Sequence, residues 1–217
     1  MGNPPWFVAG LCGETMRPTR EDIILQHVRG RTVLDVGCVG DDPADRSRPG
    51  GVHRLIFAEA AEVVGLDIDA DGVQAMRQAG YNVVHGDAET ADLGRQFQCI
   101  VAGEIIEHLA SPGLFLANMR RHLAAGGEMI VTTPNAFYPN RILDILFLGH
   151  VRMNPSHTCW YCPATLERTL RMAGYADVEI HMVNYKGRLG GLGLWPTFFR
   201  RGFRTDIVAI ARVERNP

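Results

Sequence analysis

The ten residues VLDVGCVGDD, at positions 33–42, decide the fold of this chain. An apolar run that carries Asp35 ends at Gly37, and a glycine lets the backbone turn tightly where it must approach a ligand. The loop departs from the dinucleotide-binding pattern G-x-G-x-x-G, because Val39 stands where a second glycine is expected and Asp41 follows. Acidic side chains are poor partners for a pyrophosphate, so this loop favours a ligand that carries positive charge.

Strand-like and helix-like runs alternate on both sides of this loop. Strands are predicted at 31–37, 62–68, 82–87, 97–103, 128–134, 176–183 and 204–213, and helices at 53–61, 69–80, 111–127, 139–150 and 163–175. Asp69 and Ser111 are predicted N-caps, and Gly80 is a predicted helix stop. This alternation predicts an α/β, doubly wound fold, in which helices cover both faces of a parallel sheet. Ligands of such sheets bind beyond the carboxyl ends of the strands.

The chain has 217 residues, of which 46% are hydrophobic and 21% are charged, and its formal net charge is −2. Because no linker, repeat or low-complexity run divides it, we expect a single domain over residues 1–217. The net charge argues against bulk nucleic acid as a partner. No apolar run approaches the ~20 residues of a membrane span, and the first residues lack a positive leader. We therefore expect a cytoplasmic protein with reduced cysteines and no membrane partner.

The regular alternation weakens after Pro134. The segments 135–162 and 184–203 are irregular, and both are expected near the ligand edge of the sheet. Irregular segments of this length are often functional lids, so we expect them to shape a substrate pocket. The apolar stretch 142–148 is expected to be core or a contact in a homodimer.

Five motifs follow one another in order. They are VLDVGC (33–38), VVGLDID (63–69), GDAE (86–89), FQCIVAGEIIEHL (97–109) and LAAGGEMIVTTPN (123–135). Together, at this spacing, they resemble the motifs of the class I S-adenosylmethionine-dependent methyltransferases. The resemblance implies a Rossmann-like, mostly parallel, seven-stranded sheet with an antiparallel last strand. It also implies S-adenosyl-L-methionine as the cofactor.

The resemblance and the residue chemistry agree on how the cofactor would be held. Gly37 would let the backbone close on the methionine part, and Asp35 would hold its amino group directly or through water. Asp67 would accept from both ribose hydroxyls, as a charge-assisted acceptor. Asp87 would accept from the adenine amino group, with the Ala88 amide beside the ring. The full predicted cofactor-binding set is Asp35, Gly37, Cys38, Asp67, Ile68, Asp87, Ala88 and Glu104.

Glu104, Glu107 and His108 lie in an otherwise apolar stretch after the fourth predicted strand. Their spacing of i, i+3 and i+4 predicts that they share one face of a helical turn. Two carboxylates on one face repel each other unless a positive group lies between them. Two carboxylates and an imidazole suit Mg²⁺ or Mn²⁺, and also Zn²⁺ or Fe²⁺.

The run EIIEH, followed later by His157, is similar to metal-dependent small-RNA 3′-terminal 2′-O-methyltransferases, and EIIEH also resembles ubiquinone-biosynthesis O-methyltransferases. The resemblance implies a metal set of Glu104, Glu107, His108 and His157, with His108 and His157 as catalytic residues. Metal-free alternatives stay open. In these, Glu104 contacts the methionine part of the cofactor and His108 caps a helix or acts as a base. A purely structural role for the run is the third alternative.

These features predict methyl transfer from S-adenosylmethionine to a hydroxyl of a small molecule, such as a sugar, a glycan precursor or a secondary metabolite. Methylation of an RNA 3′-terminal 2′-hydroxyl is the enzymatic alternative, and the near-neutral charge argues against it. The third hypothesis is a non-catalytic cofactor-binding or scaffold domain. It would bind the cofactor without transferring a methyl group.

Overall fold

The computed structural model describes residues 18–40, 51–151, 154–183 and 205–214. Its strands are β1 (Thr32–Val36), β2 (Glu62–Asp67), β3 (Val83–His85), β4 (Phe97–Gly103), β5 (Leu123–Pro134), β6 (Asp177–Val183) and β7 (Asp206–Arg212). Its helices are α1 (Arg20–Val28), α2 (Gly51–Glu59), α3 (Ala70–Gln78), α4 (Pro112–Arg121), α5 (Pro139–Leu148) and α6 (Pro163–Met172). Each of the seven predicted strands is confirmed at its place in the chain.

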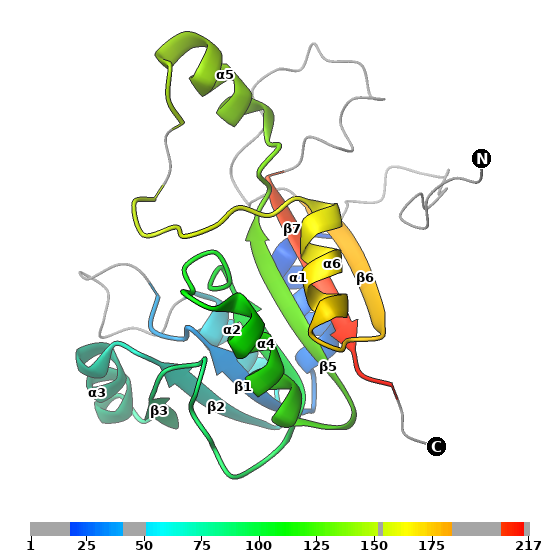
Figure 1. The fold of residues 1–217 in the computed structure, drawn as a ribbon. Coiled ribbons are helices and arrows are strands. Elements are labelled where there is room, and N and C mark those ends of the chain that lie inside the picture. Colours follow the sequence, from blue (N-terminus) through cyan, green and yellow to red (C-terminus); the bar gives the residue numbers. More distant parts are fainter. Residues whose placement is uncertain (1–17, 41–50, 152–153, 184–204, 215–217) are drawn as a thin grey trace.

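The strands form one sheet in the order β3-β2-β1-β4-β5-β7-β6. β7 is antiparallel to both of its neighbours, while the other pairs are parallel. The predicted doubly wound, mostly parallel sheet with an antiparallel last strand is therefore confirmed (Figure 1). The chain runs outward from β1 to β3 and returns to β4, so the strand order reverses between β1 and β4. A crevice for ligands is expected at the carboxyl ends of these two strands.

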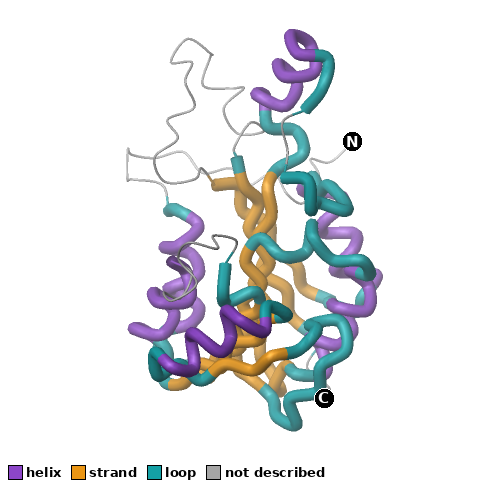
Figure 2. Tube along the Cα trace, turned by 90° about the vertical axis from the view of Figure 1, so that its left-hand side faces the viewer, coloured by secondary structure: helices purple, strands orange, loops and turns teal. Residues whose placement is uncertain are grey.

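Helices cover both faces of the sheet. Successive side chains of a strand point to opposite faces, so each strand packs against helices on both sides. Leu34 of β1 packs in a core cluster with residues of α4 and α6, whereas Val33 packs in a second cluster with residues of α1 and α2. Figure 1 shows α4 and α6 on the near face, and Figure 2 shows the strands between layers of helices. A third, smaller cluster joins the glycine loop to α3 through Val39 and Met76.

Local signals explain several helix ends. Asp69 is the N-cap of α3 and accepts hydrogen bonds from two backbone N–H groups, which confirms the predicted cap. Ser111 stands at the N-cap of α4, but its side chain makes no capping hydrogen bond. The helix predicted to reach residue 127 ends at Arg121, because β5 begins at Leu123. The helix α1 was not predicted, although Thr19 and Asp22 form a capping box at its start.

The helix α5 projects away from the sheet (Figures 1 and 2). Leu146 is 70% exposed and Phe147 is 79% exposed, so the expectation that this stretch belongs to the core is wrong. Its role in a homodimer stays a prediction. The second predicted lid segment, 184–203, lies outside the described residues. Among the helices that the structure describes, none is long and apolar enough to cross a membrane.

Candidate active site

Asp67 ends β2 at the predicted crevice and organises two neighbouring segments. The Val39 N–H donates to Asp67 Oδ2 at 2.9 Å, and the Asp69 N–H donates to Oδ1 at 2.9 Å. Each carboxylate oxygen keeps a second acceptor position. Next to it, Ile68 is 70% exposed and offers an apolar face beside these acceptors. An acceptor pair beside an apolar surface fits a ribose joined to a flat base.

Gly37 and Cys38 open the loop after β1. Gly37 has φ of +78°, a left-handed conformation in which a side chain would be strained. Cys38 is 2% exposed, and a β-carbon placed on Gly65 would lie 2.6 Å from its sulfur. Burial raises the pKa of the Cys38 thiol. The thiol therefore faces the interior, which leaves the backbone of Cys38 as the part available to a ligand.

Asp35 is held by a histidine rather than by the solvent. Its Oδ2 lies 2.7 Å from His53 Nδ1, and both side chains are almost fully buried. Burial raises the pKa of Asp35, and the hydrogen bond and charge of His53 oppose this rise. His53 lies near the start of α2, two residues after Gly51. The structure makes it the partner of the acidic residue that opens the glycine loop.

Asp87 and Ala88 follow β3 at the same edge of the sheet. Asp87 is exposed, and its Oδ1 accepts a hydrogen bond from the Glu89 N–H at 2.8 Å. Ala88 is only 6% exposed. This arrangement presents a carboxylate beside a packed stretch of backbone, as recognition of a flat base requires.

Glu104 has a different position from the one predicted. Its φ of 53° makes it the single non-glycine residue with positive φ among those described, and such strain is concentrated at functional sites. Its Oε1 accepts a hydrogen bond from Thr132 Oγ1 at 2.9 Å and lies 3.3 Å from Arg20 Nη1. Burial raises the pKa of Glu104, and the Arg20 charge opposes this rise. The carboxylate thus faces α1.

The predicted helical turn that would align Glu104, Glu107 and His108 is wrong. After the strained Glu104 the chain makes a tight turn, in which the His108 N–H donates to the Ile105 carbonyl at 2.9 Å. The left-handed backbone conformation of Glu104 interrupts the helical periodicity. The Glu104 carboxylate therefore lies apart from the side chains of Glu107 and His108. The structure does not bring Glu104 into the group of metal-ligating atoms.

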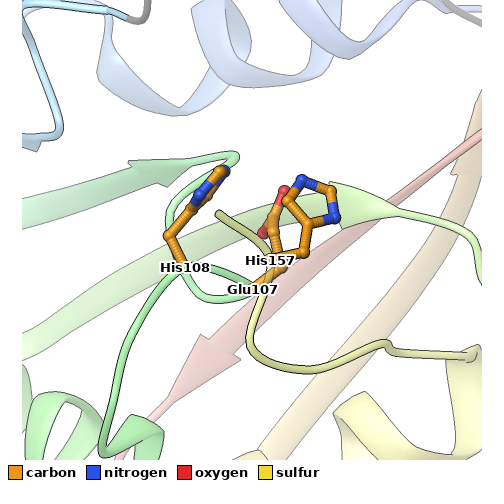
Figure 3. A group of neighbouring side chains, drawn as sticks. All are labelled: Glu107, His108 and His157. Carbon is orange, nitrogen blue, oxygen red and sulfur yellow. The ribbon is translucent and has the colours of Figure 1, made fainter. Parts of the chain in front are cut away.

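Glu107, His108 and His157 do come together (Figure 3). Each offers a ligand atom, and these atoms lie within 4.8 Å of one another. The two imidazole rings meet edge to face, with centroids 4.7 Å apart. Glu107 is 2% exposed, and its Oε2 accepts a hydrogen bond from Thr133 Oγ1 at 2.9 Å. A buried carboxylate and two histidines from segments far apart in the chain can bind a cation or move a proton.

A chain of hydrogen bonds orients the His108 ring. Ser156 Oγ donates to Asn154 Oδ1 at 2.8 Å and lies 2.8 Å from His108 Nδ1. A hydroxyl has one proton, so Ser156 must accept from His108 Nδ1–H. In the neutral ring, Nε2 then carries the lone pair. Thr158 anchors the same segment, because its N–H donates to the Glu107 carbonyl at 2.8 Å.

Three charged residues of this crevice were missed by the sequence reasoning. Arg20 belongs to the unpredicted helix α1, and Arg141 lies 4.7 Å over the ring of Trp160. Burial and the Glu104 charge raise the pKa of Asp206 to about 6. Asp206 could have been identified from the sequence, because it is a carboxylate inside the apolar predicted strand 204–213. These groups place two arginines and one further carboxylate around Glu104.

Comparisons with known proteins define the family. A family model described as "Methyltransferase domain" matches residues 13–180. The ubiquinone biosynthesis O-methyltransferase of Azorhizobium caulinodans is 30% identical over 168 residues, which cover 72% of this chain and 63% of that protein. The enzyme of the same name from Xylella fastidiosa (strain 9a5c) is 27% identical over 203 residues, which cover 90% of this chain and 79% of that protein.

The fold has close counterparts among solved structures. The crystal structure of a SAM-dependent methyltransferase from Archaeoglobus fulgidus aligns with a TM-score of 0.66 at 20% identity, over 88% of this chain and 90% of that one. This chain spans less than two thirds of the length of the Azorhizobium enzyme. The family model covers well over half of the chain, and this chain therefore belongs to the methyltransferase domain family, as a class I S-adenosylmethionine-dependent methyltransferase.

Proposed function

We propose that this enzyme methylates a hydroxyl of a small molecule, such as a sugar, a glycan precursor or a secondary metabolite. The observation that carries the proposal is the cluster of Glu107, His108 and His157 at the carboxyl end of β4. A hydroxyl must lose its proton as it attacks a methyl group, and this cluster offers groups that can take it. The named relatives, which are O-methyltransferases, support the choice of oxygen as the acceptor atom.

The cofactor residues of the proposal fit S-adenosylmethionine, which supplies an activated methyl group. Asp67 accepts from the ribose hydroxyls, and the exposed side chain of Ile68 packs on the adenine. Asp87 and Ala88 bind the edge of the base. Asp35, held by His53, faces the amino group of the methionine part across the Gly37 turn. Glu104, with its unusual backbone, serves the methionine part rather than a metal.

When no metal is bound, His108 acts as the base of the proposed reaction. Its Nδ1–H is engaged by Ser156, so Nε2 is the atom that accepts the proton of the acceptor hydroxyl. Glu107 lies beside it at 2% exposure and stabilises the positive charge that His108 gains. His157 positions the acceptor from the opposite side of the cluster. Arg141 and Trp160 lie on the first lid segment and form a wall of the acceptor site.

A divalent metal would be held by Glu107, His108 and His157. Two imidazoles and one carboxylate favour Mn²⁺, Fe²⁺ or Zn²⁺ over Mg²⁺, which prefers oxygen ligands. When bound, such an ion would lower the pKa of an acceptor hydroxyl. Thr133 and Ser156 hydrogen-bond to Glu107 and His108 and would orient them as ligands.

The first test is calorimetric titration of Mn²⁺ into the protein saturated with S-adenosylhomocysteine. We expect one ion to bind per wild-type chain, and His157→Ala to weaken binding at least about 10-fold because it removes one of three ligands. His181→Ala, which removes a partly exposed histidine on β6, is the matched control and should bind like the wild type. No binding to the wild type would contradict the metal site and leave His108 as a metal-free base.

Ser156→Ala is expected to weaken Mn²⁺ binding by about 10-fold without changing the affinity for S-adenosylhomocysteine. The substitution frees the His108 ring to rotate and to change tautomer, while the proposed cofactor residues are untouched. The same calorimetric titration measures both affinities. Unchanged Mn²⁺ affinity would show that the Ser156 hydrogen bond does not orient a ligand.

Methyl transfer is then measured with catechol and with sugars that carry neighbouring hydroxyls. Methylated product from either class would support the proposed reaction. Transfer to the 3′ end of a small RNA, falling steeply with salt, would instead favour the RNA alternative. Cofactor binding without transfer to any of these acceptors would favour a non-catalytic domain.

A further inference from the structure

Residues 87–93, between β3 and β4, carry Asp87 and Ala88, and we call this segment the adenine loop. Hydrogen bonds attach the loop to a single helix, α4, and its preceding turn at three points. At the first point, the Ser111 N–H donates to Glu89 Oε1 at 2.7 Å. The other two points are made by side chains of α4 and its C-cap. One helix therefore determines where the loop lies.

Asn118 makes the second attachment. Its Nδ2 donates to the Ala88 carbonyl at 3.1 Å and to the Ala91 carbonyl at 2.8 Å, and the residue is 5% exposed. Its Oδ1 is buried and has no hydrogen-bond partner among the described residues. An apolar side chain of the same size would avoid this unsatisfied oxygen. The favourable contribution of the Asn118 amide at this position is therefore its two hydrogen bonds to the adenine loop.

His122 makes the third attachment and supports Asn118. Its Nδ1 lies 2.9 Å from the Asn118 carbonyl, which can only accept, and its Nε2 accepts from the Leu93 N–H at 3.1 Å. These two partners fit the ring with its proton on Nδ1, and Asp92 Oδ1 lies 3.7 Å from Nε2. His122 is 3% exposed, so the arrangement is shielded from water. The loop is held at Ala88, Ala91 and Leu93 by buried groups.

The Ala88 carbonyl and the Glu89 N–H belong to the same planar peptide, so holding this carbonyl also orients the N–H that donates to Asp87 Oδ1. The Ala88 N–H, in the preceding peptide, donates no intramolecular hydrogen bond in the part of the chain that the structure describes. It is available to the ring nitrogen of an adenine, while Asp87 accepts from the amino group. A base of the hypoxanthine type reverses both groups, because it presents an N–H to Ala88 and a carbonyl to Asp87.

We propose that Asn118 is a positioning residue that sets the selectivity of the enzyme for adenine. The proposal rests on the placement of the adenine at Asp87 and Ala88 in the proposed function. Donor and acceptor groups discriminate between bases only while their positions are held within about 0.5 Å. Asn118 does not touch the ligand and acts through the backbone of the adenine loop.

The test compares the binding of S-adenosylhomocysteine and S-inosylhomocysteine by calorimetry. We expect the wild type to prefer the adenine ligand by about 100-fold or more, since the wrong base leaves polar groups unpaired. Asn118→Leu, which keeps the size and removes both donors, is expected to reduce this preference to about 10-fold or less. Asn118→Ala is the second variant, for use if the leucine variant does not fold. Met119→Leu, in the same core beside Asn118, is the control and should keep the wild-type ratio.

The ratio of affinities separates positioning from simple structural damage, because loss of folded protein lowers both affinities together. Wild-type selectivity in folded Asn118→Leu would overturn the inference. Asp87→Ala distinguishes this failure from failure of the proposed cofactor placement. If Asp87→Ala lowers the ratio and Asn118→Leu does not, only the role of Asn118 is wrong. If Asp87→Ala keeps the wild-type ratio, the adenine is placed wrongly and both ideas fail.

Discussion

Replacing Asp67 with alanine is expected to weaken the binding of S-adenosylhomocysteine by about 10²–10⁴-fold. In the proposed site Asp67 accepts hydrogen bonds from both ribose hydroxyls, and each bond to an ionised acceptor contributes about 1.5–3 kcal/mol. The substitution also removes the acceptor that holds the Val39 N–H at 2.9 Å, so the glycine loop loses an anchor. Calorimetric titration of S-adenosylhomocysteine into the wild type and the variant measures the loss.

Asp69→Ala is the matched control for this experiment. It removes the same charge two residues further on, together with the N-cap of α3, whose loss costs about 1 kcal/mol of folding free energy. We expect its affinity for S-adenosylhomocysteine to stay within a few-fold of the wild type. Equal losses in Asp67→Ala and Asp69→Ala would show that helix stability matters here and that Asp67 does not hold the ribose.

Replacing Glu128 with alanine is expected to lower the free energy of unfolding by about 3 kcal/mol. Glu128 is 5% exposed, and its carboxylate contacts His27 at 2.7 Å, Arg31 at 2.6 Å and Arg212 at 2.9 Å. It joins α1, β5 and the end of β7 at the edge of the sheet away from the crevice. Removal leaves three basic groups close together. Arg31 and Arg212 are 40% and 34% exposed, so water replaces part of the lost interaction.

The same carboxylate makes folding stability depend on pH. Burial opposes its ionisation, but the hydrogen bond from His27 and the charges of His27, Arg31 and Arg212 outweigh burial and lower the pKa of Glu128 from 4.5 to about 2. Because the folded pKa lies below the unfolded one, the stabilisation is complete above pH 4.5 and is lost as the pH falls toward 2. The lowered pKa corresponds to about 3 kcal/mol.

Chemical denaturation followed by circular dichroism at several pH values checks both statements about Glu128. The wild type should lose stability between pH 4.5 and 2, and Glu128→Gln should show a shallower loss because its amide does not titrate in this range. Glu62→Gln is the control, since Glu62 forms an exposed pair with Arg95 and exposed pairs contribute little. A destabilisation by Glu62→Gln as large as that by Glu128→Gln would contradict the assigned role of burial.

The helix–strand alternation and the acidic residues at strand ends could be predicted from the sequence. Asp35, Asp67 and Asp87 each lie in or just after a short apolar run, and parallel strands bring their carboxyl ends to one edge. The predicted N-cap at Asp69 was also confirmed. These features depend on residues within one strand, turn or cap, and such local preferences act before any distant segment is in place.

The region around Glu104 shows where local reasoning failed. The spacing of Glu104, Glu107 and His108 fits a helix, but Glu104 takes positive φ with its N–H directed to Thr132 of the neighbouring strand. The spacing of the side chains does not show that the Glu104 N–H bonds to Thr132, which lies 28 positions later in the chain. Arg20, the partner of Glu104, was missed with the helix α1 that carries it.

The sequence by itself determined the order of the strands and of every described helix except α1, the turn at Gly37 and the family to which the motifs belong. Only the tertiary structure decided which side chains meet: Glu104 with Arg20, Asp35 with His53, and Glu107 and His108 with His157. The physical reason is that strand and turn preferences are properties of neighbouring residues. Contacts between side chains far apart in the chain depend on how the sheet and its helices pack, and no local pattern specifies that packing.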